Sequence, residues 1–173
     1  MKPFLFLILL FTLPVSAQDK HPFDNWLFKF FEGESEMFGT IYGIDGEELD
    51  QGAGRMTTII DRKKNQAISH SMIRYKSQEG KTKYVSTVTP KGKNTFAGVS
   101  EYSNGEKSNY IMTLLEGNRY RSVVKAPNGI TVTIEGKLKN ESTIETRELI
   151  KDQKGTLLWQ SKTTYKRAKK PKK

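Results

Sequence analysis

Few side chains in this sequence could carry out covalent or acid–base chemistry. The 173 residues contain no cysteine and only two histidines, His21 and His70. Thiol nucleophiles, disulfides and cysteine-based zinc sites are therefore excluded, and so are clusters of histidine ligands. No Gly-x-Ser-x-Gly, His-Glu-x-x-His or phosphate-binding glycine loop occurs. We predict that the protein is not an enzyme and needs no cofactor.

Acidic side chains gather in the first third of the chain. Glu32, Glu34 and Glu36 alternate along a segment typical of a strand, so their carboxylates share one face. Such carboxylates can hold Ca²⁺, but the spacing of a calcium-binding loop is missing. We predict no metal site and expect these acids to pair with the basic remainder of the chain.

The chain as a whole is strongly basic. Lys and Arg number 29 against 19 Asp and Glu, a net charge of +10. Residues 166–173 hold six bases and no acid, which predicts a disordered tail. We hypothesise that this tail docks on anionic lipid or lipopolysaccharide, the alternative being a solubilising tail without a partner. Its bases are Lys166, Arg167, Lys169, Lys170, Lys172 and Lys173.

The N-terminus has the pattern of an export signal. Residues 1–3 are basic, residues 4–13 are apolar, and Val15 and Ala17 occupy the −3 and −1 positions of a cleavage site. The apolar run is shorter than the ~20 residues that cross a bilayer. We predict that residues 1–17 are removed and that the mature protein is periplasmic or extracellular. This location argues against nucleic acid as a partner.

The elements that must position any site are strands. From residue 33 onward, segments rich in Thr, Val, Ile and Tyr alternate with turn signals such as Asp45-Gly46 and Asn104-Gly105. Asn-Gly and Asp-Gly pairs supply the positive φ angles of tight hairpins. The even spacing predicts ten antiparallel strands at residues 33–43, 51–61, 66–76, 81–89, 94–103, 106–115, 118–126, 129–138, 142–151 and 156–167.

Ten antiparallel strands leave two unpaired edges unless the sheet closes on itself. We therefore predict an all-β fold, a single up-and-down barrel over residues 18–165, with a β-sandwich as the alternative. Many strands carry Ser or Thr on both faces, which suits a barrel around a partly polar cavity.

One segment departs from the strand pattern. Residues 24–31 follow Pro22, begin with Asp24-Asn25 and belong to a stripe of apolar residues at 23, 26, 27, 30 and 31. Such a stripe after a capping residue predicts a short N-terminal helix. We expect it to plug one end of the barrel, the alternative being a helix that touches a membrane or a partner.

Two short motifs carry a family resemblance. The Phe31-Glu32-Gly33-Glu34-Ser35-Glu36 entry into the first strand and the Thr163-Thr164-Tyr165-Lys166-Arg167 exit of the last strand resemble secreted bacterial lipocalin-like proteins of unassigned function. These are calycin-type barrels, although better-known lipocalins carry Gly-x-Trp where this chain has Phe31-Glu32-Gly33. The resemblance covers the whole mature chain and implies a closed barrel with a small-ligand cavity.

The favoured function is an exported, monomeric barrel that binds a small amphipathic or apolar molecule without chemistry. Its candidate lining residues are His70, Met72, Arg74, Tyr110, Met112 and Trp159. Arg74 would be the partner of a ligand anion. The main alternative is an interaction protein that docks on anionic envelope surfaces through the basic tail, and a haem protein or barrel enzyme ranks third. An internal cavity would favour the first function and a filled barrel the second.

Overall fold

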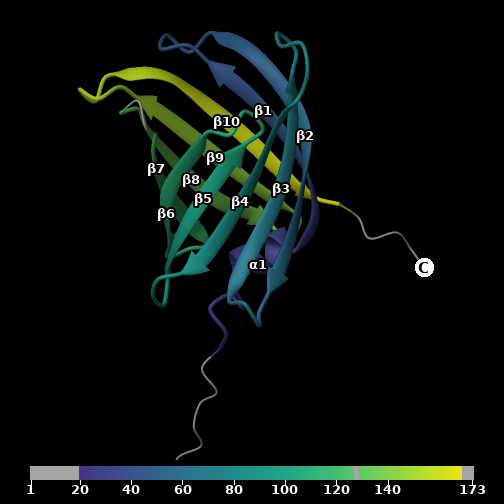
Figure 1. Ribbon diagram of the computed structural model, residues 1–173. Helices are drawn as coiled ribbons and strands as arrows, with labels where there is room; N and C mark the ends of the chain where they lie inside the picture. The colour runs from purple at the N-terminus through teal and green to yellow at the C-terminus, as the bar shows by residue number, and fades with distance from the viewer. Residues whose placement is uncertain (1–19, 127–128, 169–173) are drawn as a thin grey trace, which may run out of the picture.

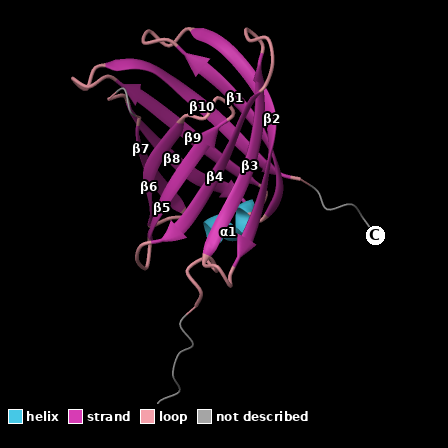
Figure 2. Cartoon of the chain, viewed as in Figure 1, coloured by secondary structure: helices cyan, strands magenta, loops and turns pink. Residues whose placement is uncertain are grey.

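Ten antiparallel strands close into a barrel in the computed structural model, which describes residues 20–126 and 129–168 (Figures 1 and 2). Each strand pairs with its neighbours in sequence, and β1 pairs with β10 to close the ring. The elements are α1 (Trp26–Phe31), β1 (Gly33–Tyr42), β2 (Glu48–Asp61), β3 (Gln66–Tyr75), β4 (Thr82–Pro90), β5 (Thr95–Tyr102), β6 (Lys107–Leu115), β7 (Arg119–Lys125), β8 (Thr131–Asn140), β9 (Thr143–Lys151) and β10 (Leu157–Arg167). The predicted all-β up-and-down barrel with a short N-terminal helix is confirmed.

The inner and outer faces of the wall follow from strand alternation. Residues directly opposite each other on neighbouring strands share a face of the sheet. The register pairs Met37 with Gly54 and Tyr165, and Gly54 with Ile73. Because Met37 and Ile73 are buried, this set marks the inner face, and every second residue on each strand joins it.

The helix fills one end of the barrel. Figure 1 shows α1 inside the lower end of the ring of strands. The buried residues Phe23, Leu27, Phe28 and Phe30 form one apolar cluster with inner-face residues such as Phe96. The rings of Phe23 and Phe96 stack with centroids 5.8 Å apart. We call Phe23 and α1 together the plug. No helix in the described ranges is long and apolar enough to cross a membrane.

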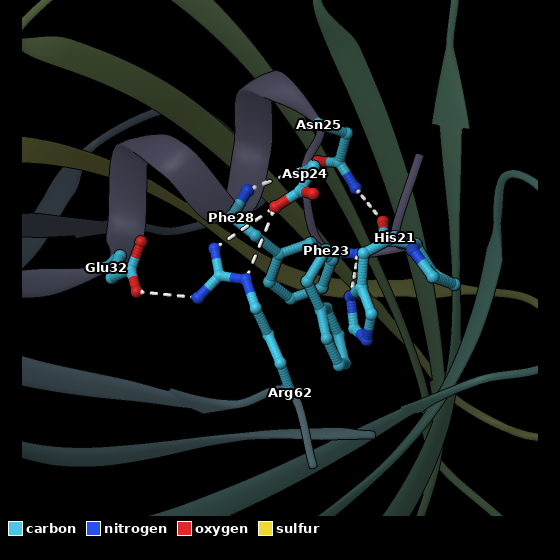
Figure 3. Close-up of polar contacts among 8 residues, drawn as sticks. His21, Phe23, Asp24, Asn25, Phe28, Glu32 and Arg62 are labelled. Carbon is cyan, nitrogen blue, oxygen red and sulfur yellow. Dashed lines mark hydrogen bonds and ion pairs between the residues drawn. The ribbon is translucent and has the colours of Figure 1, made fainter. Parts of the chain in front are cut away.

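Polar contacts hold the plug at both ends of its helix (Figure 3). The side chain of Asn25 caps the helix, since its Oδ1 accepts from the backbone N–H groups of Leu27 and Phe28 at 3.0 and 3.2 Å. Arg62, in the β2–β3 turn, forms ion pairs with Asp24 at 3.1 Å and with Glu32 at 3.2 Å. These contacts fix both ends of the helix to the rim of the barrel.

The last strand also holds the plug. Arg167 donates from Nε to the Phe30 carbonyl at 3.1 Å and from Nη2 to the Lys29 carbonyl, and its guanidinium lies over the Phe30 ring. A cation at the C-terminal carbonyls of a helix is favoured by their partial negative charge. β10 ends at Arg167, so the first two residues of the predicted tail, Lys166 and Arg167, belong to the last strand. Lys169, Lys170, Lys172, Lys173 and the predicted signal fall outside the described residues.

Candidate ligand-binding site inside the barrel

Small hydroxyl side chains line much of the inner face. The buried polar residues identified in the described chain are all serine or threonine: Ser35, Thr58, Ser71, Ser86, Ser100, Ser108, Ser122, Thr146, Ser161 and Thr163. Some bond across strands: the Oγ atoms of Ser86 and Ser100 lie 2.6 Å apart, and Thr146 Oγ1 donates to the Thr163 carbonyl at 3.2 Å. Small residues on an inner wall leave volume in the middle of the barrel that the plug fills only at one end.

Tyrosines stand on the same inner face above the plug. Tyr75, Tyr84, Tyr102 and Tyr110 point into the ring, yet each keeps part of its surface accessible. A side chain inside a closed barrel keeps accessible surface only where it borders a space that water can enter. Burial raises the pKa of Tyr84 and of Tyr110 to about 12, so these phenols are protonated near neutral pH and can donate hydrogen bonds.

Two of the inner tyrosine rings lie flat on glycines of the adjacent strand. The Tyr110 ring covers Gly98, and the Tyr120 ring covers Gly136, so that a Cβ at either glycine would clash with the ring. Each ring is thereby held close to the wall instead of crossing the interior. This arrangement keeps the aromatic surface along the inner wall of the barrel.

Glu148 places a carboxylate in this interior. It lies on β9 between Thr146 and Ile150, both buried on the inner face, and its Oε2 accepts a hydrogen bond from Ser161 Oγ at 2.9 Å. Burial raises the pKa of Glu148 above its ordinary value, and the Ser161 hydrogen bond partly opposes that rise. The Glu148 charge also contributes to the raised pKa of Tyr75 and Tyr84, after burial, which places the three groups within electrostatic reach.

We define the open half of the barrel interior as the inner-face residues Glu148, Ser161, Tyr75, Tyr84 and Tyr102, which give this half polar groups. Its carboxylate can accept hydrogen bonds or hold a proton, and its phenols can donate to a ligand or present their ring faces. Beneath it, the plug and its neighbours supply an apolar floor. Such a combination of apolar surface with a few convergent polar groups is typical of small-molecule sites.

Three of the six predicted lining residues lie on the inner face. Tyr110 points into the barrel, and Met112 is buried in the cluster around the plug. Trp159 stands opposite the buried Ile150, so it belongs to the inner face near the open end, where it is 36% exposed. A ligand role for these three residues stays a prediction.

The other three predicted residues point outward, which corrects their assignment to the lining. His70, Met72 and Arg74 alternate with the inner-face residues Ser71 and Ile73 along β3, so their side chains leave the wall on the opposite side. His70 and Met72 border an outer groove of about 590 Å³ between β3 and β5. Alternation fixes which residues share a face, but it does not tell which of the two faces is the inner one.

The sequence analysis missed Glu148, Ser161, Tyr75 and Tyr84. For Glu148 a signal was present, because Ile144, Thr146 and Ile150 alternate with it on what reads as the apolar face of a strand. A charged residue on a buried face is a candidate functional residue, because burying a charge costs free energy. Ser161 carries no such signal by itself, since it matters only through its hydrogen bond to Glu148.

The outer wall carries most of the basic charge. A groove of about 1280 Å³ crosses it from β3 over β2, β1, β10, β9 and β8 to β7. Its lining contains more bases than acids: Arg74, Lys76, Arg119, Lys137, Lys139, Arg147 and Lys162 against Glu135 and Glu145. Lys139 is already paired with Glu145 at 3.0 Å. The groove therefore has a clear positive excess.

The acids near the N-terminus have basic neighbours. Glu32 is paired with Arg62, and Glu36 stands opposite Lys166 on one side and Arg55 on the other. Within residues 20–126 and 129–168, no group of three histidine, aspartate or glutamate side chains is placed to hold a metal ion.

Comparisons with known proteins find solved structures of similar barrel fold but no matching sequence family. The S-type phycobiliprotein lyase from Guillardia theta matches with a TM-score of 0.64 and 11% identity, over 83% of this chain and 92% of the lyase. A Nostoc punctiforme protein of unknown function from the DUF3598 family matches with a TM-score of 0.56 and 13% identity, over 81% of this chain and 48% of that protein. No family model and no curated protein sequence matches the chain. The chain is thus a closed, ten-stranded antiparallel barrel by fold.

The match to a lyase corrects the prediction that the protein is not an enzyme. That prediction relied on the absence of familiar catalytic motifs from the sequence. A barrel of the same architecture carries a lyase, so missing motifs do not exclude catalysis on this fold. The physical reason is that a barrel assembles its interior from alternate residues of many strands, which leaves no contiguous motif in the sequence.

Proposed function

We propose that the protein binds a small amphipathic molecule in the open half of the barrel interior. The observation that carries this proposal is the partial accessibility of inner-face tyrosines around Glu148, within a closed ring of strands. The apolar floor, which includes Phe96 and Met112, would receive the apolar body of the ligand. The phenols and the carboxylate would bind its polar end. The similar fold of the S-type phycobiliprotein lyase supports the proposal.

Nile red, a neutral apolar dye, tests this proposal. Neighbouring residues on β8 provide a matched pair of variants, since Ile134 points inward opposite Glu148 and Thr133 points outward. Ile134→Trp fills the interior and should abolish the fluorescence increase of the dye. Thr133→Trp adds the same bulk outside and should leave the dye affinity unchanged.

Two results would count against the proposal. Equal dye binding by both variants would place the dye on the outer wall, and no binding by the parent protein would indicate a filled barrel. Circular dichroism of each variant checks that the barrel has formed. If Ile134→Trp does not fold, Ser100→Leu and Val99→Leu form a second pair on β5, with Ser100 buried inside and Val99 exposed outside.

We further propose that the protein is exported as a secreted lipocalin-like barrel and acts as a monomer. The basic start, the apolar run and Val15 and Ala17 support export. Closure of the barrel supports the monomer, because a closed sheet has no free edge to pair with a second copy. N-terminal sequencing of the protein from outside the cytoplasm should begin at Gln18. Sedimentation should give the mass of one chain.

A second candidate function is docking on an anionic lipid surface. The observation that favours it is the basic outer groove, which adds to the positive charge of Lys166 on the outer face of β10. Each basic residue near such a surface contributes about 1 kcal/mol. Vesicles containing phosphatidylglycerol should therefore co-sediment with the protein at low salt, and neutral phosphatidylcholine vesicles should not.

Two variants separate the tail from the groove. Removal of residues 169–173 should weaken vesicle binding if the tail docks, and Arg74→Gln with Lys162→Gln should weaken it if the outer groove docks. Screening predicts that binding fades as salt rises. Binding that survives both changes and high salt would contradict an electrostatic docking function.

A further inference from the structure

Charge in this molecule is divided between the two faces of the barrel. The chain carries a net charge of +10, and the described bases on the ten strands point outward with the exception of Arg167. Arg167 lies on the inner face of β10 at the plugged end, where it is bound to the carbonyls of Lys29 and Phe30, and the strand registers place no other described Lys, Arg or His on the inner face. The remaining charged side chains of the inner face are Glu148 and, at the open rim, Asp50, which accepts a hydrogen bond from Ser77 Oγ.

This division matters for the charge of a ligand. A carboxylate or phosphate in the open half of the interior would meet Glu148 without a cation beside it, since Arg167 is bound to the plug at the other end, and burial of an unpaired charge is costly. An ammonium group would instead form a charge-assisted hydrogen bond with Glu148. The tyrosine rings around it would add cation–π attraction, since their faces carry partial negative charge.

We propose that the ligand of the barrel interior is a lipophilic amine, whose ammonium group pairs with the Glu148 carboxylate while its apolar body lies against the plug. This inference rests on the proposed function and specifies the chemical class of the ligand. Arg74 has no role in it, because its side chain points outward. Ser161 positions the carboxylate through its hydrogen bond and leaves the other oxygen of Glu148 for the ammonium.

Amine binding should depend on pH in a defined direction. The groups that face Glu148 are the phenols of Tyr75, Tyr84, Tyr120 and Tyr165, all with a raised pKa and therefore neutral, and the rim carboxylate of Asp50 lies beyond them. The group in this set whose protonation changes above the ordinary carboxyl range is then Glu148. Binding of the amine requires the ionised carboxylate, so affinity should fall as the pH is lowered through the raised pKa of Glu148.

A matched pair of fluorescent probes tests the inference on the full protein. Dansylcadaverine and dansyl-6-aminohexanoic acid share the same fluorophore and tether, and end in an ammonium and a carboxylate respectively. The amine should bind at least about tenfold more tightly, which corresponds to ~1.4 kcal/mol. The net positive charge of the protein favours the opposite order, so nonspecific attraction cannot produce this result.

Three variants show where the preference arises. Glu148→Gln should bring the two affinities to within about twofold, and Ser161→Ala should retain most of the preference. Glu145→Gln removes a carboxylate from the outer face of the same strand and should leave the preference unchanged. Nile red binding by each variant confirms that the interior is intact.

The outcomes separate this inference from the proposed function. Equal or tighter binding of the acid, with Nile red still bound, would overturn the amine and leave the binding barrel in place. A preference for the amine that persists in Glu148→Gln would also overturn it. If neither dansyl probe nor Nile red binds, the proposed function fails and the inference fails with it.

Discussion

The two halves of the barrel interior are built differently on the same ten strands. At the plugged end, Phe23, Leu27 and Phe96 are buried completely or nearly so, and aromatic rings pack edge-on or stacked. In the open half, the inner-face tyrosines keep accessible surface, and Glu148 is a carboxylate with a raised pKa. One half is a close-packed core, and the other is lined by partly accessible polar side chains.

This difference indicates how a small barrel can hold a ligand and still be stable. The plug provides apolar burial, at roughly 25 cal/mol for each Å² removed from water, and its position at one end avoids filling the whole interior. The open half gives up part of that burial in exchange for accessible polar groups. A protein tolerates such a costly carboxylate when the site has a function.

The largest expected effect comes from the plugged half. Phe96→Ala removes a fully buried ring that packs on both Phe23 and Phe28, and should lower the free energy of unfolding by about 3–5 kcal/mol. Tyr84→Ala, in the open half, should cost clearly less because its ring already borders open space. Urea unfolding of both variants measures the difference. Equal losses would show that the open half is packed as tightly as the plug.

A smaller effect of opposite sign is expected at Glu148. Its pKa in the folded protein is raised above the ordinary value of 4.5, so its contribution to stability is fully present below that pH and is lost as the pH rises through the folded pKa. Each unit of difference corresponds to ~1.4 kcal/mol. Glu148→Gln should therefore stabilise the protein at pH 8 and leave it unchanged near pH 4.

Thermal unfolding at the two pH values measures this effect. Glu145→Gln, on the outer face of the same strand, is the matched control and should bring no gain, since it removes the ion pair with Lys139. A Glu148→Gln variant that is less stable than the parent at pH 8 would contradict a destabilised carboxylate. It would also weaken the case for a functional charge in the interior.

The fold could be predicted from the sequence because its signals are local. Turn pairs such as Asp45-Gly46 and Asn104-Gly105 lie in hairpins where Gly46 and Gly105 have positive φ angles of 87° and 84°. Asn25 at the start of α1 caps the helix as its residue type suggests. Closure also followed from a general argument, since ten paired strands in sequence order leave edges that only a barrel removes.

The candidate site was only partly predictable because it depends on which face turns inward. Tyr110 and Met112 were placed correctly with the interior, whereas His70, Met72 and Arg74 were not. Both faces of β3 mix polar and apolar residues, so composition gave no direction. The pairing of Glu148 with Ser161 joins residues 13 positions apart and depends on the β9–β10 register, which no local pattern specifies.

The smallest effect is expected where the plug is tied to the rim by exposed charge. Arg62 is paired with Asp24 and Glu32, but all three side chains remain more than a third exposed, and such solvent-screened ion pairs contribute little to stability. Arg62→Gln should therefore lower the free energy of unfolding only slightly, and high salt should remove most of the difference by screening. Urea unfolding at low and high salt measures both quantities, with Lys107→Gln, which breaks the exposed pair with Glu101, as a control away from the plug.

Nile red affinity should not change in Arg62→Gln, because apolar burial holds the plug in place without the ion pairs. A loss of dye affinity in this variant alone would show that the plug position controls the open half, and that the two halves are coupled instead of independent.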